Sequence, residues 1–481
     1  MGNIAQTLRA KAGGLADVSA SLVAALFELG ADVHVALPHY RRMFNIEAGK
    51  LIDRELRAYR EILSDARIHL AEDRIFHYRD EVYSCYHGEG KKLSLAFQRE
   101  VINNILPKVD PDLIHCNDWM TGLVPAMARR TGVPCLFTVH NIHTQEITLS
   151  EIEDRGIDAA EFWTDLYYVR PSHTYEETRW SNPVDLLTSG IFAAHFVNTV
   201  SPTFLREVCE GRHRFVPDSV RRELANKLLA GCAFGILNAP NPSFNPRTDP
   251  GIEVNYSWED HAQAKRKNKL RLQERLGLAE DPTAALFFWP SRLDPTQKGP
   301  QLLAEIMYEM VSDYWESGLQ IAVIANGSYQ RHFHDIARFH DLHGRVAVCD
   351  FDENLSRLGY AAADFMIMPS LFEPCGLPQM IGSIYGCLPV VSDTGGLHDT
   401  VSPLDVSRNE GNGFVFEVWD PPGLRWAMDR AMDFYRLPST IRKEQIARIM
   451  RESEERFNHA VTAKQYIDLY EKMLRRPLIG P

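Results

Sequence analysis

Glu373 is the clearest candidate for chemistry in this chain, because it is a lone carboxylate near the end of an apolar stretch. Residues 365–368 are all apolar and predict a buried strand, and Gly376 allows a tight backbone beyond it. Another short apolar stretch, 388–391, runs into Gly395-Gly396, where free N–H groups at the start of a helix suit a phosphate. Ligands bind open α/β sheets at the carboxyl ends of the strands, so we expect a carboxylate and an anion site along one edge.

Two cations are predicted to lie on the same edge. Arg292 and Lys298 follow residues 285–289, which predict a further strand of that sheet. Cations beside a Gly-Gly turn favour a diphosphate ligand. The alternative is a solvated basic loop, which would be the better interpretation if Arg292 stood alone.

The Gly-Gly turn has a counterpart near the start of the chain. Lys11 to Asp17 repeats the Gly-Gly-Leu-x-Asp spacing of Gly395 to Asp399. Either turn alone is more often an ordinary turn than a ligand site. The pair predicts two domains of similar construction.

Polar residues also follow two predicted strands in the first half of the chain. The strand at 113–116 ends before Asp118, and the strand at 135–139 ends before His140. A histidine after a strand is more often structural than catalytic. Its place at the end of a strand of an α/β sheet favours a function, and imidazole suits polar chemistry near neutral pH.

Composition limits the classes of function. The formal net charge of −12 argues against a sequence-independent nucleic-acid binder. The eight cysteines contain no CxxC pair, which favours a reduced, intracellular chain without a zinc site. No apolar run approaches the roughly 20 residues that cross a bilayer, and no secretory signal is expected at the start. We therefore expect a soluble, cytoplasmic protein, or a plastid protein if the source is a plant.

Alternation of strands and helices predicts two doubly wound α/β domains. In the second half, strands are expected near 285–289, 319–325, 345–350, 364–368, 388–391 and 413–416. The Pro-rich stretch after Asn238 is the best linker. The predicted domains are 1–245, 246–455 and a C-terminal helical segment, 456–481, that returns to the first domain. Residues 65–90 are expected to form an inserted hairpin region.

The first domain is expected to lack its first strand. Residues 1–10 have only Ile4 and Leu8 as large aliphatic residues, although a phosphate turn should follow a strand. The helix predicted over Leu15 to Leu29 nevertheless carries a full apolar stripe. The expected explanation is an N-terminally truncated gene product, and the alternative is that residues 1–10 supply a poor substitute strand.

A series of motifs stands in a characteristic order. They are Lys11-x-Gly13-Gly14-Leu15, His115–Trp119, Thr138–Asn141, Thr199–Glu207, Gly235–Asn238, the Arg292 to Lys298 loop, Phe372–Leu377 and Thr394–Leu397. Together they resemble the bacterial glycogen synthases and plant starch synthases over nearly the whole chain. The resemblance implies two Rossmann-like domains that face a central cleft, the GT-B arrangement, and no bound metal or other cofactor.

The same resemblance implies retaining transfer of glucose from ADP-glucose to the non-reducing end of an α-1,4-glucan. It assigns catalytic roles to Glu373 and His140. Diphosphate binding is implied for Lys11, Gly13, Gly14, Arg292, Lys298, Thr394, Gly395 and Gly396. Contacts to the donor sugar are implied for Asp118, Asn238, Cys375, Gly376 and Leu377, and contact with adenine for Phe351.

The chain also departs from the family pattern. The Arg292 to Lys298 loop is one residue longer than usual, Met120 stands where a histidine is usual, and Ala239 follows Asn238 in place of glycine. These departures leave open a related retaining transferase with another sugar nucleotide or a small acceptor. A non-catalytic glucan-binding relative is the remaining alternative. The sequence does not define the oligomeric state.

Overall fold

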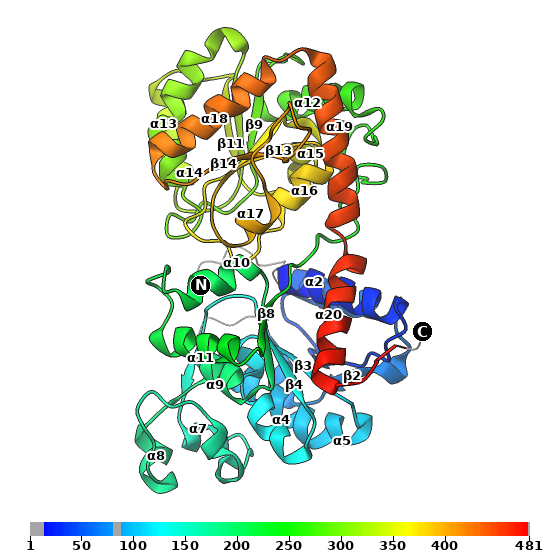
Figure 1. Cartoon of the computed structure of the whole chain (residues 1–481), viewed down its shortest axis with the longest axis vertical. Helices are drawn as coiled ribbons and strands as arrows, with labels where there is room; N and C mark the ends of the chain where they lie inside the picture. Colours follow the sequence, from blue (N-terminus) through cyan, green and yellow to red (C-terminus); the bar gives the residue numbers. More distant parts are fainter. Residues whose placement is uncertain (1–13, 80–87, 480–481) are drawn as a thin grey trace. The chain divides into compact units, whose positions relative to one another are not determined.

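The computed structural model describes residues 14–79 and 88–479, and the chain divides into two compact units. Unit 1 comprises residues 1–237 and 459–481, and unit 2 comprises residues 238–458 (Figure 1). Each unit has parallel strands with helices between them, as the alternating sequence pattern predicts. No helix in the described ranges is long and apolar enough to cross a membrane.

Unit 2 is built on one parallel sheet of six strands in the order β11-β10-β9-β12-β13-β14. The strands are β9 (Leu286–Trp289), β10 (Gln320–Ile324), β11 (Val346–Cys349), β12 (Phe365–Met368), β13 (Leu388–Ser392) and β14 (Phe414–Phe416). The helices are α12 (His261–Leu276), α13 (Pro300–Asp313), α14 (Gln330–Phe339), α15 (Glu353–Ala362), α16 (Pro378–Ile384), α17 (Gly395–Thr400), α18 (Pro421–Tyr435) and α19 (Ser439–Arg456). All six predicted strands are confirmed.

The order of this sheet reverses between β9 and β12. From β9 the chain moves outward through β10 to β11, and then returns to place β12 on the other side of β9. Such a switch point leaves a crevice at the carboxyl ends of the two central strands, because their connections leave in opposite directions. The loops after β9 and β12 are therefore the expected place for a ligand in unit 2.

Unit 1 carries a parallel sheet with the order β3-β4-β7-β8, a parallel pair β1-β2 and a short antiparallel pair β5-β6. Its strands are β1 (Val35–Pro38), β2 (Ile68–Ala71), β3 (Ile114–Asn117), β4 (Cys135–Val139), β5 (Glu146–Ile147), β6 (Val184–Asp185), β7 (Phe196–Thr199) and β8 (Ala233–Gly235). Its helices are α2 (Gly14–Glu28), α3 (Ile46–Arg60), α4 (Glu89–Glu100), α5 (Leu106–Val109), α6 (Val124–Ala128), α7 (Leu149–Glu153), α8 (Tyr175–Ser181), α9 (Leu186–Ala193), α10 (Pro202–Cys209), α11 (Asp218–Leu229) and α20 (His459–Leu474).

Two sequence predictions for this region have different outcomes. Within the described residues 65–79 and 88–90, the expected inserted hairpin is wrong, because β2 pairs in parallel with β1, with Ile68 opposite Val35. A parallel pair needs a crossover, and α3 supplies it. The missing first strand was predicted for residues 1–10, which lie outside the described residues.

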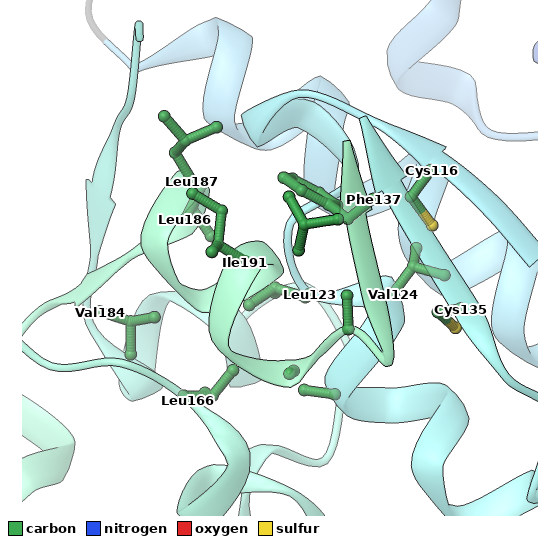
Figure 2. Packing of buried hydrophobic residues seen from close by; sticks show 14 of the residues in the cluster. Cys116, Leu123, Val124, Cys135, Phe137, Leu166, Val184, Leu186, Leu187 and Ile191 are labelled. Atoms are coloured by element: carbon green, nitrogen blue, oxygen red, sulfur yellow. The ribbon is translucent and has the colours of Figure 1, made fainter. Parts of the chain in front are cut away.

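The core of unit 1 is organised around Phe137, at the centre of β4. Its ring packs against α9, which contributes Leu186 and Ile191 to the same buried cluster (Figure 2). Gly190 permits this approach, because a Cβ there would lie 2.4 Å from the ring of Phe137. Strand β4 is thereby fixed at the position from which His140 emerges.

Helix α20, at the end of the chain, belongs to unit 1 and packs beside α2 (Figure 1). A buried polar network ties it to the sheet. His115 Nδ1 lies 2.8 Å from Tyr470 Oη, and its Nε2 lies 2.6 Å from Thr138 Oγ1. Asn198 accepts from Thr138 and donates to Tyr466 Oη, 3.0 Å away. Burial lowers the pKa of His115 to about 4, so the ring joins this network as a neutral group.

The Pro-rich stretch after Leu237 is held by unit 2. Asp249 is fully buried, accepts from Tyr385 Oη at 2.5 Å, and pairs with Arg357 at 3.1 Å. Tyr256 Oη donates to the backbone carbonyl of Tyr385. These contacts explain why the unit boundary lies at 237/238, although the proposed domain boundary was 245/246.

Candidate active site

The loops at the β9/β12 switch point bring Lys298 and Glu373 together. Lys298 Nζ lies 2.5 Å from Glu373 Oε2, and Ser370 Oγ donates to the same oxygen at 3.1 Å. The two side chains are 12% and 7% exposed, so the pair is largely removed from water. Low local dielectric strengthens this pair and any interaction that it makes with a charged ligand.

The backbone holds these two loops in register. Leu371 donates from its N–H to the carbonyl of Gln297, and Trp419 Nε1 donates to the carbonyl of Pro369 at 2.8 Å. Gly299 has φ +69°, and a Cβ there would lie 2.2 Å from the Pro369 oxygen. Glycine is therefore required next to Lys298 for the loops to approach this closely.

The Gly395-Gly396 turn follows β13 and contacts the same loop. The N–H of Gly396 donates to the carbonyl of Glu373 at 2.9 Å, and a Cβ at Gly396 would lie 2.0 Å from the carbonyl oxygen of Cys375. Gly395 has φ +45°. The structure thus places the predicted anion turn directly against the predicted carboxylate loop, with Thr394 as the residue before helix α17.

Cys375, Gly376 and Leu377 form the connection from Glu373 to α16. The thiol of Cys375 is buried, which raises its pKa to about 12, and it receives a backbone hydrogen bond from Asn238. The thiol is therefore protonated and serves as a small packing group. Gly376 has φ +73°, and Gln379 bonds to the carbonyls of Cys375 and Gly376 at 3.0 Å each.

Arg292 and Phe351 are the other two predicted residues of unit 2. Arg292 is partly exposed in the loop after β9. Burial opposes ionisation of Asp294 nearby, but hydrogen bonds from Thr296 and the charges of Arg292 and Lys298 lower its pKa overall. Phe351 follows β11, is 38% exposed, and its N–H donates to Asn326 Oδ1 at 3.0 Å. An exposed ring at this edge suits a flat ligand group.

In unit 1, Asp118 and His140 lie together at the carboxyl ends of β3 and β4. Asp118 Oδ1 accepts from the backbone N–H of His140 at 2.7 Å. Asp118 has φ +55° and ψ −179°, a conformation that is strained for any residue with a side chain and that clusters at functional sites. Burial raises the pKa of Asp118 to about 7 despite its hydrogen bonds from His140 and Asn141.

The ring of His140 is held in one orientation. Its Nε2 lies 2.9 Å from Asn117 Oδ1, which assigns the proton to Nε2 and leaves Nδ1 as an acceptor. The ring of His140 is partly exposed, but the loss of hydration on burial, together with the smaller effect of charge on His115, lowers its pKa to about 3. His140 can therefore position a hydroxyl group, but it does not supply a proton near neutral pH.

We expect His140 to stay neutral throughout a titration from about pH 8 to about pH 5, because its pKa in the folded state lies below this range. In the unfolded chain the same ring should titrate near about 6.5. Nitrogen-15 spectra of histidine-labelled protein, with the resonance assigned by His140→Gln, measure this directly. The same spectra in urea are the control, and a folded-state midpoint near that of the unfolded chain would contradict the prediction.

The predicted site residues thus fall into two groups. Asp118 and His140 are close together in unit 1, whereas Asn238, Arg292, Lys298, Phe351, Glu373 to Leu377 and Thr394 to Gly396 share the carboxyl edge of unit 2. Gly14 is the first residue of α2, and Lys11 and Gly13 lie outside the described residues.

Three supporting residues were missed by sequence reasoning. Ser370 bonds to Glu373, Gln379 holds the Cys375 to Gly376 backbone, and Trp419 ties the loop after β14 to Pro369. Ser370 could have been noticed as a hydroxyl at a strand end. Nothing in the sequence indicates Gln379 or Trp419, because their partners are backbone carbonyls, which carry no sequence signal. The carbonyls bound by Gln379 lie one helical turn before it, whereas the carbonyl bound by Trp419 lies far away in the sequence, at Pro369.

Comparisons with known proteins agree with this construction. The sequence profile of the starch synthase catalytic domain matches residues 5–220, and that of the glycosyl transferases group 1 matches residues 284–433. A glycogen synthase from Syntrophotalea carbinolica is 31% identical, with 96% of each chain covered. A glycogen synthase from Bacillus subtilis is 30% identical, with 97% of this chain and 96% of the relative covered.

A solved structure is similar to this chain as well. The catalytic domain of starch synthase IV from Arabidopsis thaliana, bound to ADP and acarbose, superposes with a TM-score of 0.76 at 26% identity, and 97% of each chain is covered. The GT-B class expected from the sequence is confirmed. This chain belongs to the glycogen and starch synthase family of glycosyltransferases.

Proposed function

We propose that this enzyme transfers glucose from ADP-glucose to the non-reducing end of an α-1,4-glucan, with retention at the anomeric carbon, in the cytoplasm and without a metal. The observation that carries the proposal is the Lys298–Glu373 pair beside the Gly395-Gly396 turn, at the switch point of unit 2. The glycogen synthase names of its relatives and the ADP and acarbose of the starch synthase structure support the choice of substrates.

In the proposed reaction, the bond between the anomeric carbon and the diphosphate breaks, and a bond to the acceptor 4-hydroxyl forms on the same face. The acceptor proton goes to the departing diphosphate. Lys298 and Arg292 are proposed to stabilise the negative charge that grows on the leaving group. Pre-placed cations lower the barrier because they need no reorganisation during the reaction.

Glu373 is proposed to face the sugar on the side where positive charge develops at the anomeric carbon. Its oxygen is held by Lys298 and Ser370, so the carboxyl group is oriented before the reaction begins. The neutral His140 is proposed to accept from a sugar hydroxyl through Nδ1, with its backbone fixed by Asp118. Phe351 is proposed to lie against adenine.

The donor is tested with purified protein and glycogen, supplied with ADP-glucose in one assay and UDP-glucose in another. We expect incorporation of glucose from ADP-glucose to be the faster reaction, and we expect EDTA to leave its rate unchanged because protein cations hold the phosphates. Loss of rate in EDTA with recovery in Mg²⁺ would contradict the metal-free mechanism. Preference for UDP-glucose, or glycogen binding without turnover of either donor, would overturn the proposal.

A further inference from the structure

A buried glutamine lies between the loop that carries Glu373 and the helix that begins at the anion turn, Gly395-Gly396. Gln379 is the second residue of α16 and is 1% exposed. Its Nε2 donates to the carbonyls of Cys375 and Gly376 at 3.0 Å each, and it lies 3.0 Å from Thr400 Oγ1 on α17. A side-chain amide has two N–H donors, so three acceptors leave neither of them unused.

These contacts close a ring of hydrogen bonds that joins the two loops. Thr400 Oγ1 accepts from Gln379 and donates to the carbonyl of Gly396 at 2.6 Å. The N–H of Gly396 donates to the carbonyl of Glu373 at 2.9 Å, and the chain from there to α16 completes the ring. Because bonded groups in a buried network orient one another, the ring fixes the backbone after Glu373 relative to the anion turn.

The partners of the Gln379 amide also fix its orientation. Turned over, the amide would point Oε1 at two carbonyl oxygens, which have no proton to donate. In the observed orientation no donor within the described part of the chain bonds to Oε1. A Cβ at Gly376 would lie 2.5 Å from Oε1, so glycine at this position makes room for the amide. Gln379 therefore acts as a hydrogen-bond donor only.

The backbone that Gln379 holds is the one predicted to contact the donor sugar, at Cys375 to Leu377. The anion turn is predicted to bind the diphosphate. Sugar and diphosphate stand on the two sides of the bond that breaks, so their relative placement sets the geometry of the reaction. A displacement of about 1 Å can cost on the order of 10²-fold in rate. The cations proposed to hold the diphosphate, Arg292 and Lys298, lie on a loop outside this ring of hydrogen bonds.

We propose that Gln379 is a positioning residue, which holds the Cys375 to Leu377 backbone so that the donor sugar is aligned with its leaving group. Gln379 acts through the carbonyls that its amide binds and does not itself contact the substrate. The inference rests on the proposed function, because that reaction supplies the sugar and the leaving group. Loss of the amide should slow transfer far more than it weakens binding of ADP, which has no sugar to align.

The first test compares Gln379→Leu with Gln320→Leu. Gln320 is the matched control, because it is a buried glutamine of unit 2 whose Nε2 donates to the carbonyl of Ala279 at 2.7 Å, at the amino end of β10. In Gln379→Leu we expect kcat to fall about 10- to 100-fold while the Kd for ADP, measured by calorimetry, stays within about threefold of the wild-type value. Gln320→Leu should lower the melting temperature and leave kcat unchanged.

Gln379→Glu provides a readout that a loss of stability alone would not produce. A protonated carboxyl group has nearly the shape of the amide and one O–H donor in place of Nε2, whereas a carboxylate would face two carbonyl oxygens without a donor. Burial and these oxygens favour the neutral form and raise the pKa of the introduced carboxyl group. The ratio of its kcat to the wild-type kcat should therefore be highest near about pH 5.5 and fall roughly tenfold or more by about pH 8.5, as the proton is lost. Gln320→Glu should show no such change in kcat ratio.

Thr400 gives an independent check of the ring. Thr400→Val removes the hydroxyl that links Gln379 to Gly396, so it should also lower kcat, whereas Thr400→Ser keeps the hydroxyl and should restore the wild-type rate. If Gln379→Leu does not fold, the pH dependence of Gln379→Glu and the two Thr400 variants decide the question.

The proposal would be overturned by a wild-type kcat in folded Gln379→Leu, by an equal loss of kcat in Gln320→Leu, or by a Gln379→Glu ratio that does not change with pH. A loss of ADP affinity as large as the loss of kcat would also overturn it. The comparison uses whichever of ADP-glucose and UDP-glucose the wild-type chain turns over faster, with the matching nucleoside diphosphate in the binding assay. A wrong donor assignment therefore leaves this test intact, whereas a wild-type chain that turns over neither donor would overturn the proposed function and this inference with it.

Discussion

Replacement of Glu373 by alanine is expected to lower kcat by about 10²- to 10³-fold while the chain stays folded. One electrostatic partner of a developing charge is commonly worth about 3–4 kcal/mol of transition-state stabilisation. The side chain hydrogen-bonds to Lys298 and Ser370, and its removal leaves the Lys298 ammonium, 12% exposed, without its carboxylate partner, so we expect a folded protein with a lowered melting temperature. Glucose transfer to glycogen at saturating ADP-glucose is the measurement.

Two companion variants separate charge from structure. Glu373→Gln keeps an oxygen for Lys298 and Ser370 but removes the negative charge, so it should be folded, bind ADP and remain slow. Lys298→Ala should weaken ADP binding as well as slow transfer, because its charge is proposed to hold the diphosphate in the ground state too. Circular dichroism and thermal unfolding check the fold. Turnover near the wild-type rate in a folded Glu373→Ala protein would contradict the catalytic role.

The sheet of unit 2 could be predicted closely because each of its strands is a short apolar run between helical segments. The strands predicted at 285–289 and 364–368 appear in the structure as β9 and β12, and every residue of these two strands is buried, as is typical of parallel sheets. Strand order is a different matter. No local sequence pattern predicts that β12 lies beside β9, so the position of the switch point is known only from the structure.

Unit 1 contains a strand pairing that local sequence patterns did not predict. The short strand-like pieces and polar turns of residues 65–90 predict an inserted hairpin region, but residues 68–71 form a strand that pairs in parallel. Their partner is β1, which lies on the far side of α3 in the sequence. A four-residue strand carries too little pattern to tell the two pairings apart.

The sequence predicted the charged residues of the candidate site, but it did not predict the residues that hold their loops in place. Glu373 and Lys298 could be found because they follow apolar strands whose carboxyl ends share one edge of the predicted sheet, where α/β proteins bind ligands. The contacts that position them come from elsewhere in the chain, as with Trp419, which reaches the carbonyl of Pro369. The contacts of buried side chains far from any motif could not be predicted either. Asp249 is the clearest case, because it follows a Pro-rich stretch whose composition predicts a linker.

Asp249→Ala is expected to destabilise unit 2 by about 3–5 kcal/mol, because it leaves the Arg357 guanidinium, 11% exposed, and the Tyr385 hydroxyl without their buried partner. Glu274→Ala is the matched control, since it removes an exposed carboxylate whose surface pair with Arg271 is expected to contribute little to stability. Hydrogen exchange of amides in β9 and β12 reports on unit 2 alone, which avoids treating the two-unit chain as a single transition. Equal protection of these strands in the two variants would show that Asp249 does not anchor the segment after Leu237.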